Sequence, residues 1–105
     1  MAFADNLAEL PAVDHLARGE LLDGDDIVGV IENRPGSAGS VRVYAWLAQR
    51  HGRIDRAAAE EGIRLYAEHT EDARLNPGKH PNIDRLLAIA AGASPLRARL
   101  VVKPA

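Results

Sequence analysis

Short apolar runs near the start of the chain predict a β-hairpin. Residues 20–22 and 27–31 look like two strands, the second apolar almost throughout, and Asp23 and Gly24 begin the polar stretch between them. An Asp-Gly pair favours such a turn because glycine readily adopts the positive φ that the turn needs. The second run is so apolar that we expect this strand to be central or covered on both faces. Gly29 within it indicates a bulge or a close neighbour.

Alternation of apolar and polar residues predicts a third strand at residues 96–103. One face of this strand is apolar and the other is basic. A basic face is typical of an edge strand that resists aggregation, or of a pairing surface. The inward positions are Leu96, Ala98, Leu100 and Val102, and the outward positions are Arg97, Arg99 and Lys103.

Apolar residues at helical spacing predict three main helices and a short N-terminal one. Ser37 or Ser40 caps the first main helix and Gly52 ends it. Asp55 caps the second, in which Gly62 permits close packing against a neighbour. The predicted segments are residues 3–10 (a short helix or an ordered arm), 41–51, 55–74 and 83–91.

Strands at both ends of the chain with helices between them predict an α+β fold. We expect a small antiparallel or mixed sheet, made by the N-terminal hairpin plus the C-terminal strand. About three helices would pack on one face of this sheet. The length of 105 residues fits one globular domain, residues 1–105.

The stretch from Asn76 to Asp84 is the most informative candidate site. Two prolines and a glycine make it a stiff loop that leads directly into a helix, and we expect Asn82 to cap that helix. Lys79 and His80 would then lie where free N–H groups and the helix dipole favour an anion. The candidate ligand-binding residues are Lys79, His80, Asn82 and Asp84. The alternative is a plain helix–helix connection whose lysine and histidine are solvated.

A second hypothesis makes the same region catalytic. His69 and Asp72 share one helix face, and His80 approaches from the loop. A histidine oriented by an aspartate is suited to general base catalysis, and Lys79 would hold an anionic substrate. The spacing matches no metalloenzyme motif, so a surface histidine with acidic neighbours is the alternative.

The glycine-rich loop before the first main helix is a secondary candidate. Its residues Gly36, Ser37, Gly39 and Ser40 resemble a phosphate cradle, because glycines expose backbone N–H groups. The loop matches neither the P-loop nor the dinucleotide fingerprint. A flexible strand-to-helix connection is the alternative.

Composition narrows the range of functions. The net charge of −2 gives no electrostatic reason to expect nucleic acid or an anionic membrane as a partner. Without cysteine, disulfides and zinc–thiolate sites are excluded. We expect no bound metal and no cofactor. No secretory signal or apolar span is evident, so we expect a cytoplasmic protein.

Two segments resemble a known family. They are Ala67-Glu68-His69-Thr70-Glu71-Asp72-Ala73 running into the 76–84 loop, and Gly36-Ser37-Ala38-Gly39-Ser40-Val41 upstream. Together they are similar to a family of short bacterial single-domain proteins known only as a domain of unknown function. The resemblance spans nearly the whole chain. It implies that the loop at 76–84 belongs to the fold's pattern, and it implies no activity.

These observations favour a small bacterial protein that works by binding, as a homodimer, with an anion site at the 76–84 loop. Its partner would be a small anion or a protein surface. Dimerisation is expected because a small core and an open sheet edge favour it. The alternative is a small enzyme that uses His69 or His80 as general base, with Asp72 or Asp84 orienting it. An enzyme needs His69, Lys79 and His80 around one concave pocket with a perturbed titration.

Overall fold

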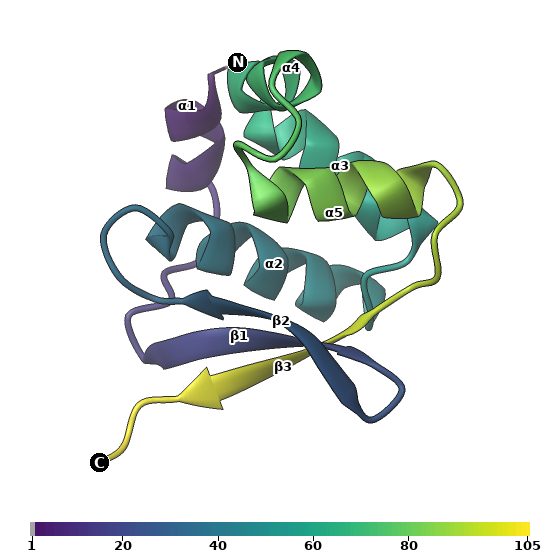
Figure 1. The fold of residues 1–105 in the computed structure, drawn as a ribbon. Helices are drawn as coiled ribbons and strands as arrows, with labels where there is room; N and C mark the ends of the chain where they lie inside the picture. The colour runs from purple at the N-terminus through teal and green to yellow at the C-terminus, as the bar shows by residue number, and fades with distance from the viewer. Residues whose placement is uncertain (1) are drawn as a thin grey trace.

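A three-stranded antiparallel sheet carries all the helices on one of its faces (Figure 1). The computed structural model describes residues 2–105. Its elements confirm the predicted α+β fold, with five helices where about three were expected. In chain order they are α1 (Phe3–Ala8), β1 (Leu16–Asp23), β2 (Asp26–Glu32), α2 (Ala38–His51), α3 (Arg56–Tyr66), α4 (Glu68–Leu75), α5 (Pro81–Ala90) and β3 (Arg97–Val102).

Helix α2 lies between the sheet and the pair formed by α3 and α5 (Figure 1). A helix in such a position must be apolar on most of its surface. The sequence of α2 meets this requirement, and Gly52 ends the helix in the left-handed region, as predicted. The buried residues of α2 are Val41, Val43, Tyr44, Ala45 and Leu47.

The strand order β2-β1-β3 puts the hairpin's second strand at an edge. The prediction that residues 27–31 are central or covered on both faces is therefore wrong. Ile27, Val28 and Val30 are about half exposed, and only Ile31 is buried. A continuous apolar run does not reveal whether a second layer covers the strand. The expectation for Gly29 is confirmed, because the ladder has an irregularity there and the Arg85 side chain lies against it.

Strand β3 is the other edge of the sheet, as its basic outward face predicted. Ala98 and Leu100 pack against the core, whereas Val102 is 62% exposed, so the prediction that Val102 faces inward is wrong at the end of the strand.

On the central strand, the carboxylate of Glu20 forms ion pairs with Arg18 and Arg99. Hydrogen bonds from these two arginines lower the pKa of Glu20.

The long helix predicted for residues 55–74 is broken in two. Ala67 has φ 52° and ψ −117°, which lies outside the helical region. Asp55 caps α3 as predicted, because its carboxylate accepts the Ala58 N–H. After the break, the Thr70 hydroxyl donates to the carbonyl of Ile63. Helical periodicity continues in the sequence across the break, and no glycine or proline marks it.

Close packing at Gly62 is confirmed. A Cβ atom built there would lie 2.6 Å from Leu86 Cδ1 and 2.9 Å from Leu47 Cδ1. Both leucines are fully buried, so they have little room to move. The absence of a side chain at Gly62 therefore lets α3 approach α2 and α5.

The start of α5 differs from the prediction by two residues. His80 is the residue before the helix and Pro81 is its first residue, so Asn82 lies inside the helix and is not its cap. Proline suits this first position, because its φ is already helical and the missing N–H has no partner to lose.

The helices that the structure describes are too short or too polar to cross a membrane.

Replacing Ala67 by glycine tests the strain at the break. An L-residue at this positive φ costs on the order of 1–3 kcal/mol, which glycine avoids. Glycine also loses more backbone entropy on folding than alanine, which offsets part of this gain. We therefore expect Ala67→Gly to raise the free energy of unfolding, measured by urea denaturation, by about 1 kcal/mol. Ala57→Gly, at an exposed position in α3, is the matched control and should lower it by about 1 kcal/mol. Equal destabilisation by both changes would contradict strain at Ala67.

Candidate functional site

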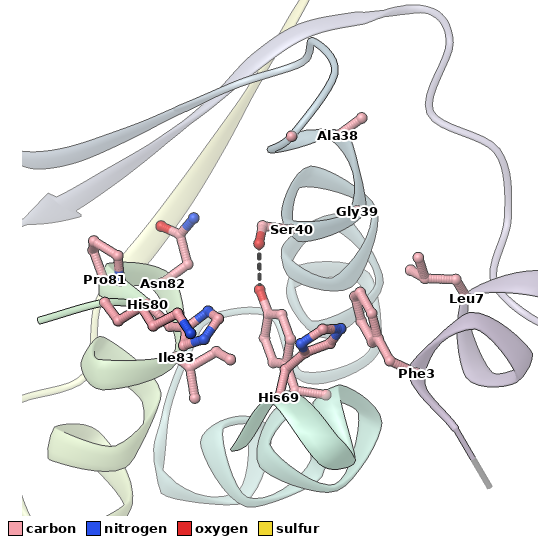
Figure 2. Close-up of a pocket in the computed structure, with 13 residues that line it drawn as sticks. Phe3, Leu7, Ala38, Gly39, Ser40, His69, His80, Pro81, Asn82 and Ile83 are labelled. Carbon is pink, nitrogen blue, oxygen red and sulfur yellow. Dashed lines mark hydrogen bonds between the residues drawn. The ribbon is translucent and has the colours of Figure 1, made fainter. Parts of the chain in front are cut away.

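A cavity of about 450 Å³ opens where four segments meet (Figure 2). They are α1, the loop leading into α2, the junction of α3 and α4, and the loop leading into α5. The cavity brings together His69, Lys79 and His80, the three residues that the catalytic hypothesis required around one pocket. It is lined by Phe3, Leu7, Gly36, Ala38, Gly39, Ser40, Tyr66, His69, Lys79, His80, Pro81, Asn82 and Ile83.

The carboxylate of Asp72 ties α4 to the 76–84 loop. Its Oδ2 lies 2.6 Å from His80 Nε2 and 2.9 Å from Lys79 Nζ. Hydrogen bonds from His80 and Lys79 lower the pKa of Asp72 to about 2. The His80 side chain is 24% exposed and that of Lys79 60%. Asp72 therefore holds one imidazole and one ammonium group at the side of the cavity.

His69 lies beside the rings of Phe3 and His80. The ring of Phe3 meets it edge to face, with 5.0 Å between centroids, and the His80 ring is 5.9 Å away. Figure 2 shows His69 next to Phe3, with His80 on the other side of the Ser40 hydroxyl. The two histidines thus approach the cavity from different segments, as the sequence led us to expect.

Glu68 anchors α1 as a wall of the cavity. Its Oε1 accepts the backbone N–H of Phe3 at 2.8 Å, which lowers the pKa of Glu68. Asn6 adds a second link, because its side-chain amide donates to the carbonyl of Leu65. These two bonds hold a helix that buries no residue completely.

Tyr66 and Ser40 join the floor of the cavity to the start of α2. The Tyr66 hydroxyl donates to Ser40 Oγ at 2.7 Å (Figure 2). Burial raises the pKa of Tyr66, so its phenol stays protonated. The sequence did not predict Tyr66 or Phe3 as pocket residues. The one signal that could have found them is the low aromatic content of 4%, which makes each ring worth locating.

The loop at residues 36–40 shapes the cavity more than it supplies hydrogen-bond donors to it. The N–H groups of Ser37 and Ala38 donate to the carbonyl of Arg34, and that of Ser40 donates to Ser37. These three N–H groups are therefore not open to a phosphate. Gly39 allows α1 to approach, because a Cβ atom there would lie 3.3 Å from Leu7 Cδ1.

Asn82 and Asp84 take part mainly in bonds within the protein. The carbonyl of Asn82 accepts from the Tyr44 hydroxyl, and its side-chain oxygen accepts from Arg85. The carboxylate of Asp84 accepts the Gly78 N–H at 2.9 Å. Asn82 lines the cavity. Asp84 does not line it, and its bond to Gly78 stiffens the loop.

Residues 2–105 contain no group of three or more histidine, aspartate or glutamate side chains placed to hold a metal ion.

One known protein family matches nearly the whole chain. The profile of a family described as an uncharacterized protein conserved in bacteria (DUF2322) matches residues 3–100. The chain belongs to this family. The resemblance seen in the sequence is confirmed by this match, which assigns no activity. Neither the comparison with curated proteins nor that with solved structures finds a match.

The pH dependence of stability tests the bonds of Asp72. Its pKa falls from 3.8 to about 2 on folding, so the ionised carboxylate stabilises the fold above pH 4. This contribution is lost as the pH falls from about 4 to about 2. Asp72→Asn should therefore be less stable than wild type at pH 7 and nearly equal to it at pH 2, measured by urea denaturation.

Asp25→Asn, on the exposed hairpin turn, is the control for this experiment. It should leave the pH profile of unfolding close to that of wild type. A stability difference between wild type and Asp72→Asn that stays constant from pH 7 to pH 2 would contradict the ion pairs at Asp72.

Proposed function

We propose that this protein is a binding module whose pocket takes a small anionic ligand. One observation carries the proposal: Lys79, His80 and His69 arrive from two segments at the side of a single cavity. The volume of about 450 Å³ is within the range of about 300–1,000 Å³ that is usual for sites of small organic ligands.

The basic side chains at this side of the cavity can donate to an anion. Asp72 bonds Lys79 and His80 and offsets part of their charge. A ligand anion would gain a charge-assisted hydrogen bond from the Lys79 ammonium group and a further bond from an imidazole N–H.

Inorganic phosphate is the probe for the anion site. We expect Lys79→Ala to weaken phosphate binding at pH 6 about tenfold in isothermal titration calorimetry, the effect of losing one charge-assisted hydrogen bond. Lys103→Ala also removes one lysine, at an exposed position outside the cavity, and should leave the affinity unchanged. Equal effects of the two changes would mean that phosphate responds to overall charge, and the proposed site would be wrong.

The pair formed by Asp72 and His80 favours a second candidate, a small enzyme. A carboxylate that bonds one imidazole nitrogen orients the ring and leaves the other nitrogen to accept a proton. In this reading His80 or His69 is the general base and Lys79 holds an anionic substrate.

Asp72→Asn separates the two candidates. In a binding module, Asp72→Asn removes a repelling charge and also loosens the side chains that hold the anion, so the affinity for phosphate should change little. An enzyme would instead lose activity, since its base would no longer be oriented. A substrate whose turnover falls sharply in Asp72→Asn would favour the enzyme.

We also propose that the protein acts as a homodimer through the apolar strip of β2, defined as Ile27, Val28 and Val30. Support comes from the exposure of these three side chains, each about half open to solvent on an edge strand. A second copy brings the same strip, so the contact can be symmetric. The expectation of a cytoplasmic location stays a prediction.

Sedimentation equilibrium tests the homodimer. Wild type at about 100 μM should sediment as a dimer, and Val30→Lys should sediment as a monomer, because a charge in an apolar contact opposes association. Val102→Lys adds the same charge on an exposed residue of β3 and should remain dimeric. A monomeric wild type would refute the homodimer without affecting the pocket.

A further inference from the structure

Four rings lie in sequence along the wall of the cavity. Phe3 stacks on Tyr66 with 5.1 Å between centroids and 18° between planes. His69 meets the edge of Phe3, and His80 follows at 5.9 Å from His69. This row of four rings lines the cavity, as Lys79 does.

We infer that the ligand of this pocket carries its anionic group on a single aromatic ring, as a one-ring aromatic phosphate or carboxylate does. The inference rests on the proposed anion site and adds the chemical class of the ligand. The anionic group would face Lys79 and His80, and the ring would face Phe3, whose own ring stacks on the buried Tyr66.

The two ends of the cavity differ in chemistry. Lys79 and His80 come from the loop before α5, whereas Phe3 and Leu7 come from α1 on the other side of the cavity (Figure 2). Tyr66 is only 3% exposed, so the partly exposed side chains of Phe3 and Leu7 supply most of the apolar surface at this end. An inorganic anion would occupy only the cationic side and leave water against the apolar end. A ring attached to the anion would replace that water.

The distribution of aromatic residues supports the same assignment. The chain contains one phenylalanine, two tyrosines and one tryptophan, and two of these four line this cavity. In a chain with so few rings, a stacked pair beside two histidines makes an unusual concentration. Aromatic pairs prefer the offset and edge-on arrangements that the row already shows, so a ligand ring can extend it.

The competing explanation is that Phe3 only anchors α1 to the helical layer. Asn6 offers a matched control, because its amide bond to Leu65 also anchors α1 and it does not line the cavity. Asn6→Ala should loosen α1 to a similar extent and leave the ring surface intact. Phe3→Leu keeps an apolar side chain of similar size and removes the ring.

The experiment compares phenyl phosphate with methyl phosphate by isothermal titration calorimetry at pH 6. In wild type we expect phenyl phosphate to bind about tenfold more tightly, the effect of one buried aromatic contact. In Phe3→Leu this ratio should fall to about two, with the affinity for methyl phosphate unchanged. In Asn6→Ala the ratio should stay near ten. Benzoate against acetate repeats the comparison for a carboxylate, and the pair with the larger ratio assigns the anionic group.

Two results would overturn the inference while leaving the anion site in place. One is equal affinity for phenyl and methyl phosphate in wild type. The other is an equal fall of the ratio in Phe3→Leu and Asn6→Ala, which would make Phe3 an anchor only. If none of the four probes binds, the proposed anion site fails together with the inference.

Discussion

The break at Ala67 determines where the candidate site lies. Helix α3 is fixed by close contact of Gly62 with Leu47 and Leu86, so its direction cannot adapt. The chain leaves helical geometry at Ala67 and starts α4 in a new orientation. Strained backbone of this kind persists only where the surrounding packing enforces it, and it occurs often at functional sites. Here it brings His69 and Asp72 to the 76–84 loop.

Asp72 then converts this orientation into a defined arrangement of charges. It bonds both His80 and Lys79, while Asp84 bonds the loop backbone at Gly78. Two carboxylates thus stiffen a loop that already contains Pro77 and Pro81. The consequence is that Lys79 and His80 are held at the side of a cavity whose other walls are mostly apolar. Such preorganisation lowers the entropy cost of holding a ligand.

Local signals in the sequence predicted the elements well. The Asp-Gly turn, the caps at Asp55 and Gly52, and the alternation at the C-terminal end all correspond to observed features. The break at Ala67 was missed because alanine is a good helix former and nothing local opposes the helix. The burial of β2 was misjudged because an apolar run specifies a strand without specifying what covers it.

The candidate site was predicted in part. The sequence pointed to Lys79, His80 and His69, since polar groups in a stiff loop and a shared helix face are local features. It could not show that Phe3 and Tyr66 lie beside them, because these two residues are 63 positions apart and meet only through the packing of α1 on α3. Asn82 was misread as a cap because Pro81 takes the first helical position before it.

Histidine imidazole signals in an NMR titration with inorganic phosphate test the anion site most directly. The chain has four histidines, of which His69 and His80 line the cavity. His51 bonds Glu61 and His15 is exposed, so these two serve as internal controls. The anion site predicts saturable shifts of His69 and His80 at pH 6, with His15 and His51 unmoved. Equal small shifts of all four, or none, would contradict it.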